Sequence, residues 1–493
     1  MLPENAQHPQ SAKLTRRGLL KGAAGLGLLA QLGGLSALGA FASPAGREEL
    51  SAANPLPVGP PLSLADDALL EEIEHANFLY FWEQTNPRTG LTRDRYNVRM
   101  GEGNRLSSIA ATGFGLTAMC IGEKRGYVSR DEASERALTA LRFFWNKLPQ
   151  ENGFFYHWAD FETGQRIKRS EVSSIDTAIL LCGILTCRAH FPHSEINDLA
   201  ERIFNRVNWR WLSEDTLLLP MGWTPERGFL HYRWDSYCEL MMLYLLGLGS
   251  ESHPLPTGTW EAWKRKRFNY EGIEYIGSFA PLFVHQYSQA WFDFRGERDQ
   301  YADYYENSIL ATEAHRRFCL NLGRQFPDYS AELWGISASD SERSYMVWGG
   351  PPRSGPIDGT IVPCASAGSL PFLPSAVMRV LRTIRYQYGA GTWSRYGFVD
   401  AFNPLANWYD TDIVGIDTGI TLLMAENART GWVWQTFMKN PEAQRGMERA
   451  GFHSYSPAPY QIIRPQPVST ASLGTRERRH VAQQWSAEAG RER

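Results

Sequence analysis

The sequence predicts an all-α fold, an (α/α)6 barrel of helical hairpins with long aromatic loops at one end. Apolar residues recur at helical spacing from about Asp66 to Gly451, and Gly and Pro separate the periodic segments. Two kinds of segment alternate. Apolar runs rich in small residues would be buried all round, whereas amphipathic runs carry charges on one face. An open α-solenoid is the alternative, but the sequence shows no repeat of fixed period.

The helical periodicity runs, in order, through residues 67–85, 107–121, 130–147, 174–191, 195–208, 235–248, 275–294, 301–322, 371–388 and 415–430. The stretch "SSIAATGFGLTAMCIGEKRGYVSRDEASERALTALRFFW" illustrates the unit. It reads as an apolar helix, a short turn and then an amphipathic helix. About ten to twelve such helices, alternating between inner and outer positions, would close the barrel.

Long loops rich in aromatic residues and glycine separate these helices. They include "LPMGWTPERGFLHYRW", "LWGISASDSERSYMVWGGPPRSGPIDGTIVP" and "YGFVDAFNPLANWYDTDIVGID". Loops of this length in a compact domain usually carry function. In a barrel of this type, we expect them to gather at one end of the inner helices and to form a cleft.

The chain is predicted to contain a twin-arginine signal peptide over residues 1–42, a linker over 43–64, the barrel domain over 65–452 and a disordered tail over 453–493. In "LTRRGLLKGAAGLGLLAQLGGLSALGAFASPA", a twin arginine precedes a Gly- and Ala-rich apolar run that ends at an A-x-A cleavage site after Ala42. A retained membrane anchor is the alternative, but the interspersed glycines favour removal. The linker is rich in Pro, Ala and Ser, and the tail is polar.

This signal predicts export by the twin-arginine machinery to the periplasm or beyond, without a stable membrane anchor. Twin-arginine substrates are exported folded, so the six cysteines meet a reducing compartment first. Most of these cysteines lie inside apolar helical patterns and are predicted to be small core residues. No Cys/His spacing resembles a zinc site, and no cofactor is predicted.

The composition excludes some partners and favours others. Lys+Arg 50 against Asp+Glu 53 gives no electrostatic footprint for nucleic acid or for an anionic membrane. Trp 17, Tyr 21 and Phe 24 are high counts, and flat aromatic faces with polar tips suit stacking on sugar rings. A large aromatic core is the alternative explanation. An oligosaccharide or polysaccharide is the expected partner.

Carboxylates occur where a loop turns into an apolar helix. They are Asp176 in "RSEVSSIDTAILLCGIL", Asp235 and Glu239 in "WDSYCELMMLYLLGLGS", and Asp410, Asp412 and Asp417 in "NWYDTDIVGIDTGITLLMAENARTG". Acids at helix starts are favoured by the helix dipole and by capping, and Asp176 and Asp235 fit N-caps. Glu239 fits badly, because it lies about one turn into the predicted helix. Partial desolvation there would raise its pKa, as a general acid requires.

Asp417 lies between Gly415 and Gly419, where the backbone could approach a ligand closely. Acids converging across a cleft, together with aromatic loops, indicate glycoside hydrolysis. The sequence has no GxSxG, HExxH or Walker motif outside the export signal. Among the histidines, His285 in "LFVHQYSQAWFDFRG" is the one that remains a candidate for function.

Several segments in order resemble the bacterial glycoamylase-like proteins, which include the endo-β-1,2-glucanases of glycoside hydrolase family 144. From about Asn77 to Trp434 they are "FLYFWEQTNPRTGLTRDR", "SSIDTA", "YCELMMLYLLGLGSESHPLP", "HQYSQAWFDFRG", "WGISASD", "DGTIVPCASAGSLPFLP" and "GIDTGITLLMAENARTG". Two departures are Ser173, where the family has an acid, and "GIDTG" in place of "GIDQG". They leave a sister family open.

The resemblance implies an (α/α)6 barrel that hydrolyses β-1,2-glucan with inversion. Glu239 falls on the family's general acid, Asp417 on its candidate base, which acts on water through a substrate hydroxyl, and Asp176 on a substrate-binding acid. From loop position and resemblance, the further candidates are Trp291, Trp348 and Trp408 as stacking platforms, and Gln286, Asp235 and Asp412 as hydroxyl contacts. The alternatives are a transglycosylase or phosphorylase acting on β-1,2-glucan, and a non-catalytic periplasmic glucan-binding protein.

Overall fold

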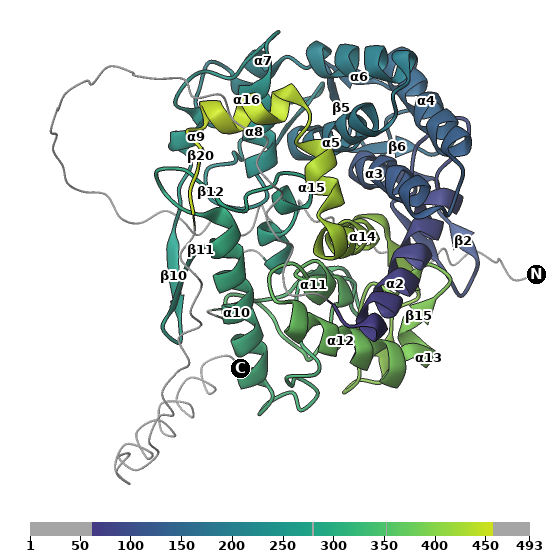
Figure 1. The fold of residues 1–493 in the computed structure, drawn as a ribbon, viewed down its shortest axis with the longest axis vertical. Coiled ribbons are helices and arrows are strands. Elements are labelled where there is room, and N and C mark those ends of the chain that lie inside the picture. Colours follow the sequence, from purple (N-terminus) through teal and green to yellow (C-terminus); the bar gives the residue numbers. More distant parts are fainter. Residues whose placement is uncertain (1–61, 279–280, 352, 457–493) are drawn as a thin grey trace, which may run out of the picture. The chain divides into compact units, whose positions relative to one another are not determined.

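The computed structural model describes residues 62–278, 281–351 and 353–456, and these residues are mostly helical (Figure 1). The predicted all-α class is confirmed in this coarse form. The chain divides into two units between Ser454 and Tyr455, and only residues 455 and 456 of the second unit are described. The predicted signal peptide, nearly all of the linker and most of the tail lie outside the described residues.

The longer helices follow the predicted periodicity with few exceptions. They are α2 (Leu64–Glu83), α3 (Ile109–Arg125), α4 (Arg130–Asn146), α5 (Ser174–His190), α6 (Ser194–Arg206), α8 (Met241–Gly249), α10 (Tyr304–Leu322), α12 (Pro374–Gln387), α14 (Gly415–Thr430) and α16 (Pro441–Arg449). Local chemistry sets several starts. Ser63, Ser108 and Ser129 each accept a backbone N–H at the N-cap, and Ser129 forms a capping box with Glu132.

Short helices connect these elements. They are α7 (Trp209–Ser213), α9 (Thr259–Ala262), α11 (Pro363–Ala367), α13 (Gly389–Thr392) and α15 (Trp432–Phe437), with the 3-10 helices η1 (Leu282–His285) and η2 (Ser288–Ala290). Pro363 stands at the start of α11, where its missing N–H costs nothing.

The strands are short and pair antiparallel. The three-stranded sheets are β19 (Asp412–Val414) with β1 (Arg95–Asn97) and β2 (Glu102–Gly103), and β7 (Val172–Ser173) with β8 (Gly222–Thr224) and β9 (Gly228–Phe229). The pairs are β3 (Leu106–Ser108) with β6 (Trp158–Asp160), β4 (Gln150–Glu151) with β5 (Phe154–Phe155), β10 (Arg267–Tyr270) with β11 (Ile273–Ile276), β12 (Glu297–Arg298) with β20 (His453–Ser454), β13 (Ala338–Ser339) with β14 (Met346–Val347), β15 (Trp393–Ser394) with β16 (Gly397–Phe398), and β17 (Phe402–Asn403) with β18 (Trp408–Tyr409). Three of them, β3, β7 and β19, directly precede the buried helices α3, α5 and α14.

Helices of two kinds pack together, as the sequence predicts. α3, α5, α8 and α14 are buried on nearly all sides, whereas α4, α6 and α12 bury one face and expose the other. α3 packs against α5, α14 and α2, and α5 also packs against α6, α8 and α15. In Figure 1, α3, α5 and α14 lie toward the middle of the first unit, with α4 and α6 at its rim. The main core therefore surrounds the buried helices.

Glycines allow the closest approach of two buried helices. A Cβ on Gly183 of α5 would lie 2.1 Å from the carbonyl oxygen of Gly113 on α3. A Cβ on Gly113 would in turn lie 2.4 Å from the carbonyl oxygen of Ile179. These helices therefore meet backbone to backbone, a distance that only glycine permits.

Two predicted helices are wrong in their bounds or type. The segment predicted over 235–248 becomes helical only at Met241. The segment predicted over 275–294 instead contains β11, η1 and η2. Its polar side chains bond to main chain of other segments: Gln286 donates to Ala365, Ser288 to Glu239, and Gln289 to Tyr304. These long-range bonds, with Pro281 before η1, override the local apolar pattern.

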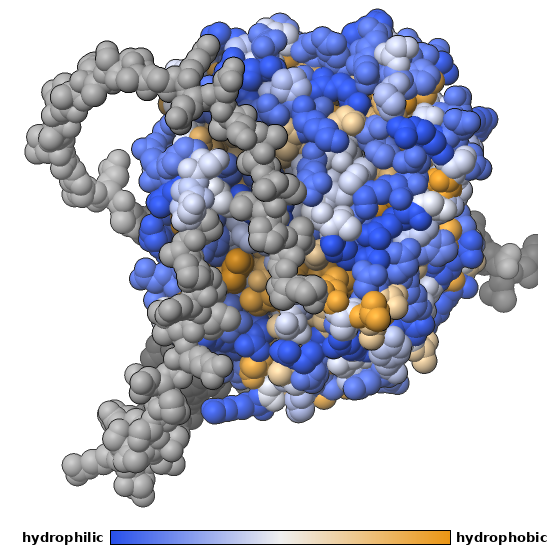
Figure 2. Space-filling view, viewed as in Figure 1, coloured by the Kyte–Doolittle hydropathy of each residue, from blue (hydrophilic) through white to orange (hydrophobic). Residues whose placement is uncertain are grey.

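The face of the molecule shown in Figure 2 is mainly hydrophilic. The large apolar side chains exposed among the described residues are separate in sequence: Leu64, Met100, Leu217, Tyr386 and Leu405. Within the described part of the chain, no helix combines the length and the apolar character needed to cross a bilayer.

Candidate active site

Glu239 lies just before helix α8 rather than inside it. The N-cap of α8 is Leu240, and no side chain caps this helix. Glu239 is 5% exposed, and its main-chain carbonyl accepts a 2.9 Å hydrogen bond from the Ser288 hydroxyl. The expected position one turn into a helix is therefore wrong, whereas the expected burial of this carboxylate is confirmed.

Asp235 does not cap a helix. The N–H of Tyr237 donates to the carbonyl of Lys264, and the N–H of Lys264 donates to the carbonyl of Asp235, both at 2.8 Å. This pairing holds the segment outside the helix, so tertiary contacts override the helical pattern. The Asp235 side chain is 46% exposed and lies 3.3 Å from the Lys264 ammonium. The N-cap interpretation is wrong, and Asp235 forms a surface ion pair.

Asp417 lies in the first turn of α14, directly after strand β19. It is 5% exposed, and its Oδ2 is buried with no hydrogen-bond partner among the described residues. A Cβ on Gly415 would lie 2.8 Å from that of Ala111, and one on Gly419 would lie 2.4 Å from Phe114. The glycines therefore serve the packing of α14 on α3. That the backbone beside Asp417 can also approach a ligand closely stays a prediction.

Asp176 is the third residue of α5, and Ser173 is the cap. The Ser173 hydroxyl accepts the N–H of Asp176 at 3.1 Å and also donates to the Asp176 carboxylate. His157 approaches from another segment, with its Nε2 3.8 Å from Asp176 Oδ2. Asp176 is 9% exposed. The N-cap prediction is wrong by three positions, and the carboxylate sits at a helix N-terminus, where the dipole favours negative charge.

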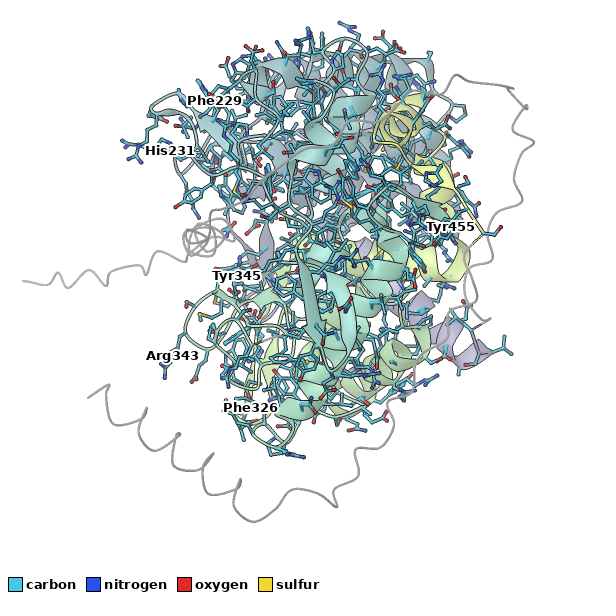
Figure 3. The ribbon with its side chains drawn as sticks, turned by 90° about the vertical axis from the view of Figure 1, so that its left-hand side faces the viewer. Phe229, His231, Phe326, Arg343, Tyr345 and Tyr455 are labelled. Atoms are coloured by element: carbon cyan, nitrogen blue, oxygen red, sulfur yellow. The ribbon has the colours of Figure 1, made fainter. Side chains whose placement is uncertain are left out.

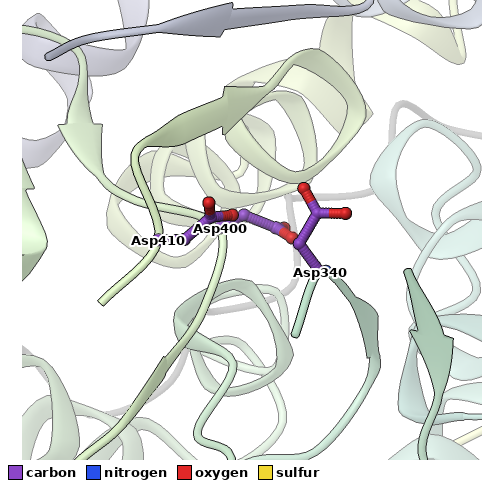
Figure 4. A group of neighbouring side chains, drawn as sticks. All are labelled: Asp340, Asp400 and Asp410. Carbon is purple, nitrogen blue, oxygen red and sulfur yellow. The ribbon is translucent and has the colours of Figure 1, made fainter. Parts of the chain in front are cut away.

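Three aspartates from separate loops form what we name the aspartate cluster: Asp340, Asp400 and Asp410 (Figure 4). One oxygen from each side chain lies within 4.8 Å of the others. Asp340 follows β13, and the other two flank the β17–β18 hairpin. The N–H of Asp340 donates to Asp400 Oδ2 at 2.6 Å, and the N–H of Asp400 donates to the carbonyl of Asp412 at 3.0 Å. Main-chain bonds thus hold the cluster in place.

Arg95 supplies positive charge beside the cluster. Its guanidinium pairs with Asp340, Asp412 and Asp94. Arg95 stands on β1, which pairs with β19 so that Asn97 faces Asp412. The Asn97 amide donates to Asp412 Oδ1 at 2.9 Å. An acidic cluster is not by itself a metal site, and here a guanidinium already offsets part of its charge.

Burial and mutual repulsion raise the pKa of two of these carboxyls. Burial raises the pKa of Asp400 well above its usual range, and the neighbouring Asp417, Asp340 and Asp410 add to the effect. Burial, then Asp340 and Asp412, raises the pKa of Asp410 to about 7. A site that holds protons on some carboxyls and charge on others near neutral pH suits acid–base chemistry.

Two of the predicted sugar contacts lie in the core. Trp291 is 0% exposed, and its indole N–H donates to the Thr117 hydroxyl at 3.0 Å. Gln286 is 1% exposed, and its amide donates to the Ala365 carbonyl and to the Ser369 hydroxyl, both at 2.8 Å. These positions do not fit a stacking platform or a hydroxyl contact, and the structure gives both residues a packing role.

The other two tryptophans lie nearer the loops. Trp348, just after β14, is buried and donates its indole N–H to the Ser339 hydroxyl at 2.9 Å. Trp408 is half-buried at the start of β18, opposite Asn403. Trp408 therefore keeps a partly open face, whereas Trp348 presents little surface.

His285 and the cysteines are core residues. His285 faces the Tyr237 hydroxyl at 3.1 Å, and burial lowers its pKa to about 3, so the imidazole is neutral. All six cysteines are buried, which confirms the prediction that they are small core residues. The candidate function of His285 has no support in these contacts.

Two cavities adjoin the cluster. One of about 390 Å³ is lined by Tyr96, Trp393, Tyr396 and Asp410, among others. A much smaller one, of about 10 Å³, is lined by Asp400, Asp417, Thr418 and Thr421, among others. Of the cluster, Asp400 therefore shares a cavity wall with Asp417.

Sequence reasoning missed Arg95, Asp340 and Asp400. Asp340 and Asp400 lie inside the long loops, which the sequence marked as functional without singling out these acids. Arg95 lies about 245 positions from Asp340 in sequence. Loop position was the available signal, and no periodicity could bring these three together.

Comparison with known proteins identifies relatives over most of the described chain. The Glycoamylase family model, described as "Putative glucoamylase", matches residues 231–441. An exo-β-1,2-glucooligosaccharide sophorohydrolase of Parabacteroides distasonis is 27% identical over 425 residues. That match covers 78% of this chain and 58% of the relative, so the chain spans under two-thirds of the relative's length.

Solved structures extend the similarity to the fold. An endo-β-1,2-glucanase of Chitinophaga pinensis, in complex with sophorotriose and glucose, is 27% identical with a TM-score of 0.74, covering 80% of this chain and 99% of the other. A β-1,2-glucanase of Parabacteroides distasonis is 26% identical with a TM-score of 0.73, covering 79% of this chain and 60% of the other. The predicted resemblance to the glycoamylase-like proteins is thereby confirmed.

Proposed function

We propose that this protein is a glycoside hydrolase that cleaves β-1,2-glucan in endo mode, with inversion of anomeric configuration. The observation that carries the proposal is similarity over 80% of the chain to a β-1,2-glucanase solved with a β-1,2-linked oligosaccharide. The buried carboxyls of Glu239 and Asp417 give the chain the pair of acids that such chemistry requires.

Glu239 is the general acid and Asp417 the general base. Protonated Glu239 donates its proton to the glycosidic oxygen as the C–O bond breaks. Asp417 accepts a proton from the attacking water, directly or through a substrate hydroxyl, while that water bonds to the anomeric carbon on the opposite face. Inversion requires room for the water, which corresponds to carboxyls roughly 6.5–9.5 Å apart.

The proposed architecture is an (α/α)6 barrel with its aromatic loops at one end. The alternation of buried and amphipathic helices supports it. Figure 3 supports the loop arrangement, because Phe229 and His231 on one long loop and Arg343 and Tyr345 on another lie on the same side of the first unit. These loops would border the substrate.

Substrate contacts are assigned to Asp176, Asp235, Asp412, Trp348 and Trp408. Asp176 and Asp412 are each 9% exposed. A sugar hydroxyl that binds either carboxylate would therefore replace a hydrogen bond or ion pair that the carboxylate now makes within the protein. The half-buried ring of Trp408 supports its role as the stacking platform. We further propose export by the twin-arginine pathway to the periplasm, where long glucans would be met.

The test is incubation of the purified protein with linear and cyclic β-1,2-glucans, and with β-1,3- and β-1,4-glucans as specificity controls. We expect internal cleavage of linear β-1,2-glucan alone or preferentially, with product of inverted anomeric configuration by proton NMR. A requirement for inorganic phosphate would identify a phosphorylase, and products longer than the substrate a transglycosylase. Binding without any product would identify a glucan-binding protein.

Glu239→Gln tests the role of Glu239 as the general acid. Loss of general acid catalysis should reduce kcat by roughly 100- to 10,000-fold while oligosaccharide binding is retained. Glu251→Gln is the matched control, since Glu251 is exposed just beyond the end of the same helix and pairs with Arg445. A Glu239→Gln protein with near-normal turnover would show that another residue donates the proton.

A further inference from the structure

Asp400 and Asp417 are neighbouring buried carboxyls. Their side chains are within hydrogen-bonding reach and line the same 10 Å³ cavity. Asp400 Oδ1 and Asp417 Oδ2 are both buried with no hydrogen-bond partner among the described residues. Two ionised carboxylates are acceptors only, so they cannot satisfy each other. A single proton between them would satisfy both.

We propose that Asp400 is a positioning residue that carries a proton and donates it in a hydrogen bond to the Asp417 carboxylate. This inference rests on the proposed function of Asp417 as the base. The bond holds the Asp417 carboxylate in one orientation, in which it can accept a proton from water.

The surroundings decide which partner keeps the proton. Asp400 is 3% exposed and faces Asp340, Asp410 and Asp417, with Arg95 as the nearby cation. Burial and these three carboxyls raise the pKa of Asp400 well above its usual range. The proposal therefore places the shared proton on Asp400 rather than on Asp417.

Main-chain contacts fix the donor. Asp400 Oδ2 accepts the Asp340 N–H at 2.6 Å, which leaves Oδ1 to carry the proton. The N–H of Asp400 donates to the carbonyl of Asp412, just before Asp417 in the chain. Strand β19, which directly precedes α14, is thus bonded to the main chain of Asp400.

Asp400→Asn keeps both bonds, because an amide can donate to Asp417 and accept from the Asp340 N–H. We expect kcat within about threefold of the wild type for Asp400→Asn, but a roughly 10- to 100-fold loss for Asp400→Ala, each with KM nearly unchanged. In the wild type, activity should fall as pH rises through the pKa of Asp400, since the shared proton is lost. Asp400→Asn should remove that alkaline limb.

Infrared difference spectroscopy gives a readout that does not need turnover. The wild-type minus Asp400→Asn spectrum at neutral pH should contain the C=O band of a protonated carboxylic acid. Absence of that band overturns the proposal, as does an Asp400→Ala protein with wild-type kcat. If Asp400→Asn is as inactive as Asp400→Ala, the charge of Asp400 is needed and the proposal is wrong.

The failure of the two proposals can be told apart. If the wild type cleaves no β-glucan but the carboxylic acid band is present, the proposed function fails and the shared proton stands. If Asp400→Ala does not fold, the comparison of Asp400→Asn with the wild type still decides the outcome, through both the pH profile and the infrared band.

Discussion

The contact between α3 and α5 predicts a sharp effect from one added methyl group. Gly183→Ala places a Cβ 2.1 Å from the carbonyl oxygen of Gly113. A normal carbon–oxygen contact is about 3.3 Å or more. The helices must therefore separate by roughly 1.2 Å along that direction. The obstructing atom is backbone, so no side-chain rotation can relieve the clash.

The cost can be set against the gain in helix propensity. Overpacking a close-packed core typically costs about 1–3 kcal/mol, and a backbone clash of this size lies at the upper end. Replacing a helical glycine by alanine returns about 1 kcal/mol. We therefore expect Gly183→Ala to lower the free energy of unfolding by about 2 kcal/mol.

Urea unfolding followed by tryptophan fluorescence measures this difference. Gly350→Ala is the control, because a Cβ at Gly350 meets nothing within 4 Å. The Gly183→Ala midpoint should fall at an unchanged m-value, while that of Gly350→Ala should stay near the wild type. A Gly183→Ala protein as stable as the wild type would refute the close approach of the two helices.

Two further predictions concern buried side chains. Trp291→Ala should lower the free energy of unfolding by about 3–5 kcal/mol, because Trp291 packs in the core. The KM of the folded variant should stay nearly unchanged. A large rise in that KM would instead indicate that Trp291 stacks on a sugar. Burial and the neighbouring Glu426 raise the pKa of Glu74 to about 8, so folded Glu74 keeps a proton that the unfolded chain loses above its ordinary pKa of about 4.3. The contribution of Glu74 to stability is thus complete at low pH and is lost as pH rises toward 8. Urea unfolding from about pH 5 to pH 8 should therefore show a fall in the free energy of unfolding that is smaller in Glu74→Gln than in the wild type. The same pH dependence in both proteins would contradict the argument.

Most of the helical fold could be predicted from the sequence because periodicity is a local signal. The segments 130–147 and 415–430 differ from α4 and α14 by at most one residue. The apolar pattern failed over 275–294, where Gln286 and Ser288 bond to distant main chain. Periodicity indicates that a segment is buried, but it does not show that the backbone N–H and C=O groups of the segment bond to one another as in a helix.

The site could be predicted only in part. Glu239 and Asp417 stand out because an acid borders an apolar run, and both are buried. Helix position was a poorer guide, since Asp235 bonds to the Lys264 segment and Ser173 takes the cap expected of Asp176. Asp400 was missed because its significance comes from Asp417 and Asp340, which reach it only in the folded chain.

The electrostatics of the aspartate cluster favour function over stability. Taking a carboxylate out of water costs several kcal/mol, and one guanidinium cannot offset the carboxyls of Asp340, Asp400, Asp410 and Asp412 together. A structural network of this kind would gain stability from apolar replacements. Protonation is the other way to reduce the buried charge, and it is favoured by the pKa of Asp410, raised to about 7, and by that of Asp400, raised well above its usual range. The proposed role of Asp417 as the base would account for so many carboxyls being buried near the start of α14.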